Sequence, residues 1–115
     1  MNSADLRALQ IEEGDIIEIE SYRATIHAVA GIDDGVRPGH VSLMYGYGAD
    51  AERDGELYAL GSRANRLISD NGIFDRYTGQ PRMTALPVRV RRARAESLAR
   101  VDQPGMTAQG VRSIV

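Results

Sequence analysis

Polar side chains suited to holding a small ligand gather in three short stretches near the middle of the chain. Glycine lets backbone N–H groups approach a ligand closely, and a tyrosine ring stacks on a heterocycle while its hydroxyl still donates a hydrogen bond. An asparagine amide offers both a donor and an acceptor to the edge of a pterin or purine, and an arginine clamps a phosphate. A structural interpretation is the alternative, with glycines at turns and the asparagine capping a helical turn. The three stretches are Tyr45-Gly46-Tyr47-Gly48, Asn65-Arg66 and Gln80-Pro81-Arg82.

Catalysis by protein side chains finds little support in this sequence. All fourteen cationic residues are arginine, which excludes a catalytic lysine or a Schiff base. The absence of cysteine excludes disulfides, thiolate nucleophiles and cysteine-bound zinc or iron–sulfur clusters. His27 and His40 stand on different predicted strands and form no evident acid–base pair. The acidic segment 50–56 lacks the glycine and the final glutamate of a calcium-binding loop. We therefore expect neither a catalytic residue nor a metal ligand.

The charge distribution gives no sign of a nucleic-acid partner. The 115 residues have a formal net charge of −2, whereas nucleic-acid binding favours a positive excess. Residues 1–87 hold eight arginines and fourteen acids, a charge of −6, and residues 88–115 hold six arginines and two acids, a charge of +4. The C-terminal excess includes a run of strand arginines that is either a phosphate or RNA patch or a solvated strand face. We favour the solvated face. The run consists of Arg89, Arg91, Arg92 and Arg94.

The hydrophobic pattern predicts a mainly β domain with short peripheral helices. Apolar residues that alternate with polar ones predict strands, and Gly or Pro separates these segments. An N-terminal helix is predicted to begin at Asn2 or Ser3, with Asp5 near its positive end and Leu6 and Leu9 on its apolar side. The predicted strands are 16–20, 23–30, 40–45 and 87–91, with a hairpin joining the first two, a helical turn at 65–70, a turn at 78–81 and a long irregular excursion at 46–61.

The strand at 16–20 is predicted to have one apolar and one wet face. Ile17 and Ile19 share one side, and Glu18 and Glu20 share the other. His27 falls in the next strand, where we interpret it as a half-buried, hydrogen-bonded structural histidine. These assignments predict a sheet whose apolar face lies on a core of Val, Ile, Leu and Ala, because the chain has only six aromatic residues.

Several segments, in this order and spacing, resemble one domain family. Asp5-Leu6-Arg7-Ala8-Leu9 followed by residues 13–21 is similar to the start of the C-terminal, dinucleotide-binding domain of molybdopterin oxidoreductases of the dimethyl-sulfoxide-reductase type. Tyr45 and Tyr47 stand where members often have His and Trp. The resemblance spans residues 4–93 and continues through 36–43, Tyr45-Gly46-Tyr47-Gly48, Asn65-Arg66-Leu67-Ile68, Asp75, Thr78-Gly79-Gln80-Pro81-Arg82 and Val88-Arg89-Val90.

The resemblance implies a fold, a cofactor and a set of cofactor-binding residues. The fold would be a double-psi β-barrel over residues 1–93, and residues 94–115, which are poor in apolar side chains, would form a flexible tail. The cofactor would be molybdopterin guanine dinucleotide, with its molybdenum or tungsten held by other domains. Members usually carry a strand before the position of Met1, so the chain is expected to be an incomplete barrel or an excised piece. The expected cofactor-binding residues are Tyr45, Gly46, Tyr47, Asn65, Gln80 and Arg82.

The implied role is to hold the pterin dinucleotide of a molybdenum or tungsten bis-pterin oxidoreductase while the cofactor does the redox chemistry. The partners would be the remaining domains or the catalytic subunit of that enzyme. The alternative is a free-standing double-psi barrel that acts as a protein-interaction or regulatory module. No apolar run approaches the roughly 20 residues of a spanning helix, and the N-terminus lacks a signal-peptide pattern. We therefore expect no membrane segment and a cytoplasmic location.

Overall fold

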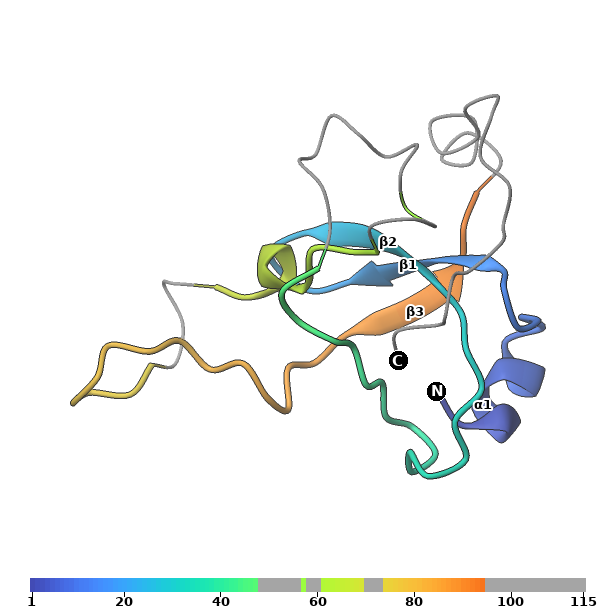
Figure 1. Cartoon of the computed structure of the whole chain (residues 1–115), viewed down its shortest axis with the longest axis horizontal. Helices are drawn as coiled ribbons and strands as arrows, with labels where there is room; N and C mark the ends of the chain where they lie inside the picture. Colours follow the sequence, from blue (N-terminus) through green and yellow to red (C-terminus); the bar gives the residue numbers. More distant parts are fainter. Residues whose placement is uncertain (48–56, 58–60, 70–73, 95–115) are drawn as a thin grey trace.

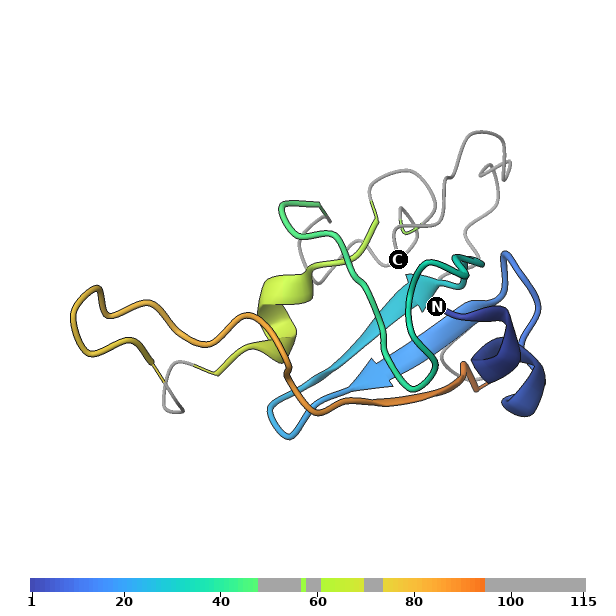
Figure 2. The ribbon, with the colours of Figure 1, turned by 90° about the horizontal axis from the view of Figure 1, so that it is seen from below.

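The computed structural model describes residues 1–47, 57, 61–69 and 74–94. Strands β1 (Ile16–Glu20), β2 (Thr25–Val29) and β3 (Arg89–Arg92) form an antiparallel sheet in the order β2-β1-β3. Helix α1 (Ser3–Ala8) lies at one end of the sheet, and the 3₁₀ turn η2 (Ala64–Leu67) lies at the other (Figures 1 and 2). The mainly β class is confirmed. These three strands do not by themselves make a closed barrel, so the double-psi β-barrel stays a prediction.

Helix α1 forms as its sequence predicts. The side chain of Asn2 accepts a hydrogen bond from the N–H of Ala4 at 2.9 Å, which makes Asn2 the N-cap. The helix ends before Gln10, which adopts a φ of 56°. Leu6 is buried, but Leu9, predicted on the same apolar stripe, is 40% exposed. The stripe therefore contacts the core at one position only.

The hairpin of β1 and β2 confirms two predicted strands and their short connection. The N–H of Ser21 donates to the carbonyl oxygen of Ala24 at 2.9 Å and closes the turn. In the register, Glu18 stands opposite His27 and Ile19 stands opposite Ile26. The predicted alternation of β2 is confirmed, because Ile26, Ala28 and Ala30 are buried while the intervening side chains are more exposed.

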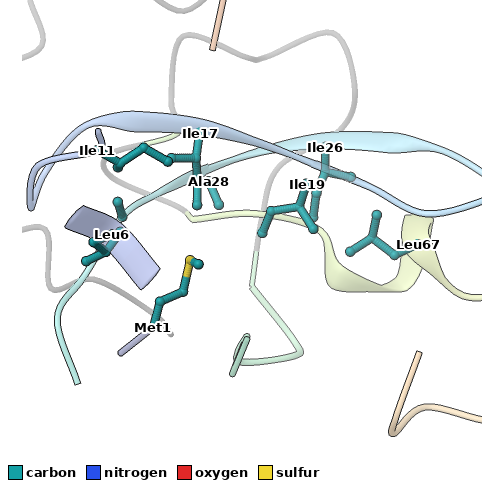
Figure 3. Packing of buried hydrophobic residues seen from close by; sticks show 9 residues of the cluster. Met1, Leu6, Ile11, Ile17, Ile19, Ile26, Ala28 and Leu67 are labelled. Carbon is teal, nitrogen blue, oxygen red and sulfur yellow. The ribbon is translucent and has the colours of Figure 1, made fainter. Parts of the chain in front are cut away.

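Strand β3 completes the sheet from the far end of the described chain. It runs antiparallel to β1 with Arg91 opposite Glu18 and Val90 opposite Ile19. The apolar face of the sheet packs on α1 and η2, and Figure 3 shows Ile17 and Ala28 above Leu6, with Ile19 and Ile26 beside Leu67. Partly buried side chains extend this core at its margin: Val41, Leu43, Leu86, Val88 and Val90.

The prediction of a wet outer face on β1 is wrong at its centre. Glu18 is only 4% exposed, because its two neighbours in the sheet cover it. Arg91 Nε donates to Glu18 Oε2 at 2.6 Å, and Arg91 Nη1 donates to Glu20 Oε2 at 3.1 Å. The hydrogen bond from Arg91 to Glu18, together with the nearby carboxylates, raises the pKa of the arginine. The solvated-face interpretation of the arginine run therefore fails at Arg91, and Arg92 also pairs, lying 3.3 Å from Asp15.

His27 is half-buried on the same outer face, as predicted for a structural histidine. Its Nε2 atom lies 3.8 Å from Glu18 Oε1. This nitrogen is buried and makes no hydrogen bond within the described part of the chain, so the predicted hydrogen-bonded ring is wrong for this atom. The outer face of the sheet thus holds a group of two carboxylates, one imidazole and one guanidinium, those of Glu18, Glu20, His27 and Arg91.

The strand predicted at 40–45 is wrong as a strand. Residues 40–45 adopt no regular secondary structure, although Val41 and Leu43 are half-buried against the core and Ser42 and Met44 are exposed. Their period-two burial therefore reflects an extended segment with one side on the core. Alternation predicts which side chains are buried, whereas a strand also requires a hydrogen-bonded neighbour.

The remaining expectations concern the loops and the ends. The helical turn predicted at 65–70 is confirmed as η2, which begins one residue earlier and ends three residues earlier. The turn predicted at 78–81 falls in an arm, residues 74–87, which projects beyond η2 away from the sheet (Figures 1 and 2). The predicted tail at 94–115, apart from Arg94, and most of the excursion at 46–61 lie outside the described residues. None of the described helices is long and apolar enough to cross a membrane.

Candidate cofactor-binding site

A cavity of about 500 Å³ opens between the β1–β2 turn and η2. Its volume falls within the range of roughly 300–1,000 Å³ that is usual for ligand clefts. Three arginines line it, and its described lining residues include no carboxylate. The cavity can therefore attract an anion without a competing negative charge. The described lining residues are Arg23, Ala24, Gly46, Tyr47, Arg63, Ala64, Asn65 and Arg66.

The turn η2 and its N-cap Arg63 supply half of this lining, and two contacts fix the turn against the sheet. The hydroxyl of Ser62, which is 7% exposed, donates to the main-chain oxygen of His27 on β2. Leu67 is 5% exposed and packs into the core. In a 3₁₀ turn, residues three apart point in the same direction. Arg63 is the N-cap of η2, and it lines the cavity together with Asn65 and Arg66.

The tyrosine–glycine stretch is divided between two cavities. Gly46 and Tyr47 line the arginine-rich cavity, and Gly46 has a φ of 92°, a conformation that favours glycine. Tyr45 instead lines a second cavity of about 810 Å³ on the apolar side of the sheet. Tyr47 is 52% exposed, so its ring is available for stacking. These residues were predicted to act as one unit, but they line two different cavities.

The second cavity is chemically distinct from the first. Its lining is mostly aliphatic, and the ionisable side chains among its described lining residues are Asp5, His40 and Tyr45. It lies along the margin of the hydrophobic core, and no arginine is among its described lining residues. A polar, phosphate-bearing ligand suits the first cavity better, because burying phosphate against aliphatic side chains is costly. The aliphatic lining includes Leu9, Val41, Leu43, Leu67, Leu86, Val88 and Val90.

Gln80 and Arg82 lie on the arm and do not line the arginine-rich cavity. The Nε atom of Arg82 donates to the main-chain oxygen of Thr84 at 2.9 Å, and the amide nitrogen of Gln80 lies 3.7 Å from the sulfur of Met83. The arm ends in a turn in which the N–H of Tyr77 donates to Asp75 at 2.8 Å. That hydrogen bond lowers the pKa of Asp75.

The structure therefore brings together Gly46, Tyr47 and Asn65 of the predicted set. It adds Arg23 and Arg63, which the sequence analysis did not single out. Arg63 lies before the helical turn predicted at 65–70, and its spacing of three from Arg66 is informative only because the structure extends that turn back to Arg63 as its N-cap. Arg23 gave no local signal, because its position depends on how the hairpin packs on η2. Across the described residues, no group of three or more histidine, aspartate and glutamate side chains is arranged to hold a metal ion.

Comparison with known proteins now defines the class of this domain. The molydopterin dinucleotide binding domain family matches residues 1–87, and the chain belongs to this family. Its cofactor class is accordingly a molybdopterin dinucleotide.

One curated relative has a sequence similar enough to compare. The chain is 33% identical over 85 residues to the arsenate respiratory reductase molybdopterin-containing subunit ArrA of Chrysiogenes arsenatis. The match covers 69% of this chain and 10% of that subunit, so the chain spans about a tenth of the relative's length. No solved structure matches the chain.

Proposed function

We propose that this chain is the cofactor-binding domain of a molybdenum or tungsten bis-pterin oxidoreductase and that it carries no catalytic residue itself. The observation that carries the proposal is the arginine-rich cavity, in which Asn65 stands among three guanidinium groups. The redox reaction, its substrate and the metal ligands would belong to other parts of such an enzyme. The double-psi β-barrel implied by the family resemblance is the fold that we propose for the whole domain.

The described residues fit the diphosphate and guanine parts of molybdopterin guanine dinucleotide. The guanidinium groups of Arg23, Arg63 and Arg66 match the negative charge of a diphosphate. The Asn65 amide makes no hydrogen bond to another described side chain, so its donor and acceptor are available to a heterocycle. The Tyr47 ring can stack on such a heterocycle. Because the dinucleotide is larger than this cavity, surfaces elsewhere must hold the remainder.

In this proposal the protein residues bind and orient, and the bound cofactor supplies the electron-transfer chemistry. Arginines on fixed secondary structure hold the phosphates without reorganising, which lowers the cost of binding. Gln80 and Arg82, on the arm, would contact the part of the cofactor outside the cavity or the neighbouring domain. The remaining domains or the catalytic subunit are the proposed partners.

Titration of the full chain with guanosine diphosphate, followed by NMR, tests the assignment of the cavity. We expect weak binding in the millimolar range, with shifts confined to the amides of Gly46, Tyr47 and residues 63–66. Asn65→Ala should weaken binding several-fold, because it removes the amide that reads the heterocycle. Thr25→Ala, an exposed position on β2, is the matched control and should leave binding unchanged. Shifts centred on the second cavity, or no shifts at all, would contradict the assignment.

Activity of the chain alone is a second test. Because the chain has no catalytic residue in this proposal, the pure 115-residue protein should not turn over a dye-linked oxidoreductase substrate. Turnover by metal-free protein would refute the proposal. Binding of a folded protein partner without any response to guanosine diphosphate would favour the interaction-module alternative.

A further inference from the structure

Arg23 connects the hairpin of the sheet to the turn that carries Asn65. Its Nη1 atom donates to the main-chain oxygen of Ile68 and lies 3.5 Å from the main-chain oxygen of Asn65. Both carbonyl groups belong to the C-terminal end of η2, where Ile68 is the C-cap. A cation at this end complements the partial negative charge of the carbonyl groups there.

The backbone that carries Arg23 is itself fixed. Ser21 is 7% exposed, and its hydroxyl oxygen accepts hydrogen bonds from the N–H groups of Arg23 at 3.2 Å and Ala24 at 3.3 Å. The guanidinium therefore projects from a closed turn at the end of a sheet. A side chain with a fixed base loses less conformational freedom when it binds a second element.

The segment around η2 is bound to the β1–β2 hairpin on both sides of Asn65. Before the turn, the buried Ser62 hydroxyl donates to the oxygen of His27; after it, Arg23 binds the oxygen of Ile68. Within the turn, the Asn65 side chain is exposed on the cavity. The orientation of this side chain therefore depends on backbone that Arg23 holds in place.

We propose that Arg23 is a positioning residue for Asn65. Its guanidinium fixes the end of η2 by binding the main-chain oxygen of Ile68, close to that of Asn65. This inference rests on the proposed function, because it assigns Asn65 to recognition of the cofactor's heterocycle. Arg23 thereby acts on heterocycle recognition through Asn65, and it also contributes one of the three charges that face a phosphate.

Two probes distinguish a positioning role of Arg23 from the contribution of its positive charge alone. Guanosine diphosphate offers a heterocycle and a diphosphate, whereas inorganic pyrophosphate offers only the charge. Loss of positioning should weaken guanosine diphosphate binding more than pyrophosphate binding, because pyrophosphate has nothing for Asn65 to read. Arg66 lines the same cavity and has no contact with the Asn65 or Ile68 carbonyl groups among the described interactions, so Arg66→Gln is the matched control for the loss of one charge.

The experiment measures the affinity of the full chain for both probes by NMR, together with the amide spectrum of the free protein. For Arg23→Gln we expect roughly tenfold weaker guanosine diphosphate binding, a smaller loss for pyrophosphate, and shifted amides at 64–68 before any probe is added. For Arg66→Gln we expect equal losses for both probes and unshifted amides at 67 and 68. Arg23→Lys should restore the pyrophosphate affinity but only part of the guanosine diphosphate affinity, because a compact, strongly hydrated ammonium on a flexible stem holds the turn less rigidly than a planar guanidinium.

Equal losses for both probes in Arg23→Gln, or unchanged amides at 64–68 in its free form, would overturn the inference. If the unmodified chain binds neither probe, the proposed function fails. The free-protein amides then still show whether Arg23 holds the turn, so the two failures are distinguishable. A circular dichroism melt of each variant confirms that it is folded before binding is compared.

Discussion

The two faces of β1 are both buried at their centres, but for different physical reasons. On the inner face, Ile17 and Ile19 are 0% and 1% exposed and pack on α1 and η2. On the outer face, Glu18 is 4% exposed and is covered by its cross-strand neighbours Arg91 and His27. One face is stabilised by removal of apolar surface from water, and the other must offset the desolvation of a charge with an ion pair.

The alternating pattern of β1 correctly predicted an apolar inner face and wrongly predicted a wet outer face at Glu18. The different origins of the two faces explain why. The inner face follows from the apolar side chains of the strand itself. The outer face follows from the pairing of β1 with β3, whose Arg91 is 73 positions away from Glu18. A charged residue on a strand is exposed only if its neighbours leave it so, and here they do not.

Ile17→Ala should produce the largest effect and would break the inner face. The isoleucine is fully buried, so its truncation leaves a cavity in the core and should reduce the free energy of unfolding by about 2–5 kcal/mol. Urea denaturation followed by circular dichroism measures this change. The control is Ile32→Ala, at a position that is 50% exposed, where we expect about 0.5 kcal/mol or less. Comparable losses for both variants would mean that the core does not lie where we place it.

Arg91→Met should have an intermediate effect and would break the outer face. It leaves the Glu18 carboxylate buried without its guanidinium partner, which is costly for a charged group. We expect a melting temperature about 4–8 °C lower. The control is Arg89→Met. Arg89 is on the same strand, but it is exposed and has no ion pair to any described residue, so its loss should change the melting temperature little. The double variant Glu18→Gln with Arg91→Met should recover part of the loss, and an additive loss would argue against the pair.

Asp34 contrasts with the buried Glu18, because it is an exposed carboxylate that holds a structural hydrogen bond. It accepts from the N–H of Ser3 at 2.9 Å, and this bond lowers the pKa of the Asp34 carboxyl. A lowered folded pKa contributes stability that is present above the ordinary pKa of the group and is lost as the pH falls through the lowered value.

Asp34→Asn should therefore reduce the melting temperature slightly near neutral pH. The gap from the unmodified protein should narrow as the pH falls from about 5 towards 2, where both proteins lack the charge. Thermal melts across this pH range measure the gap. A gap that widened on acidification would reverse the sign that we assign to this carboxylate. The effect should be the smallest of the three, because the group is exposed and screened by solvent.

The candidate site also depends on both local and long-range information. Gly46, Tyr47 and Asn65 could be selected from the sequence as candidate ligand-binding residues, and the structure places all three in the lining of one cavity. Arg23 was not predictable, because nothing near it in sequence indicates that a hairpin turn meets a 3₁₀ turn more than forty residues later. Tyr45 stands beside Gly46 in sequence and yet lines the apolar cavity, because the chain bends at these two residues and Gly46 has a φ of 92°.

Elements whose signals are local could be predicted from the amino-acid sequence. The cap at Asn2, the alternation of β1 and β2, their short hairpin and the apolar residues of the core all depend on side chains within a few positions of one another. Long-range packing places β3 beside β1, buries Glu18, sets one side of residues 40–45 on the core without strand hydrogen bonds, and brings Arg23 to the turn of Asn65. These outcomes depend on the pairing of segments far apart in the chain, and such pairing is set by the packing of the whole core rather than by any residue's own preference.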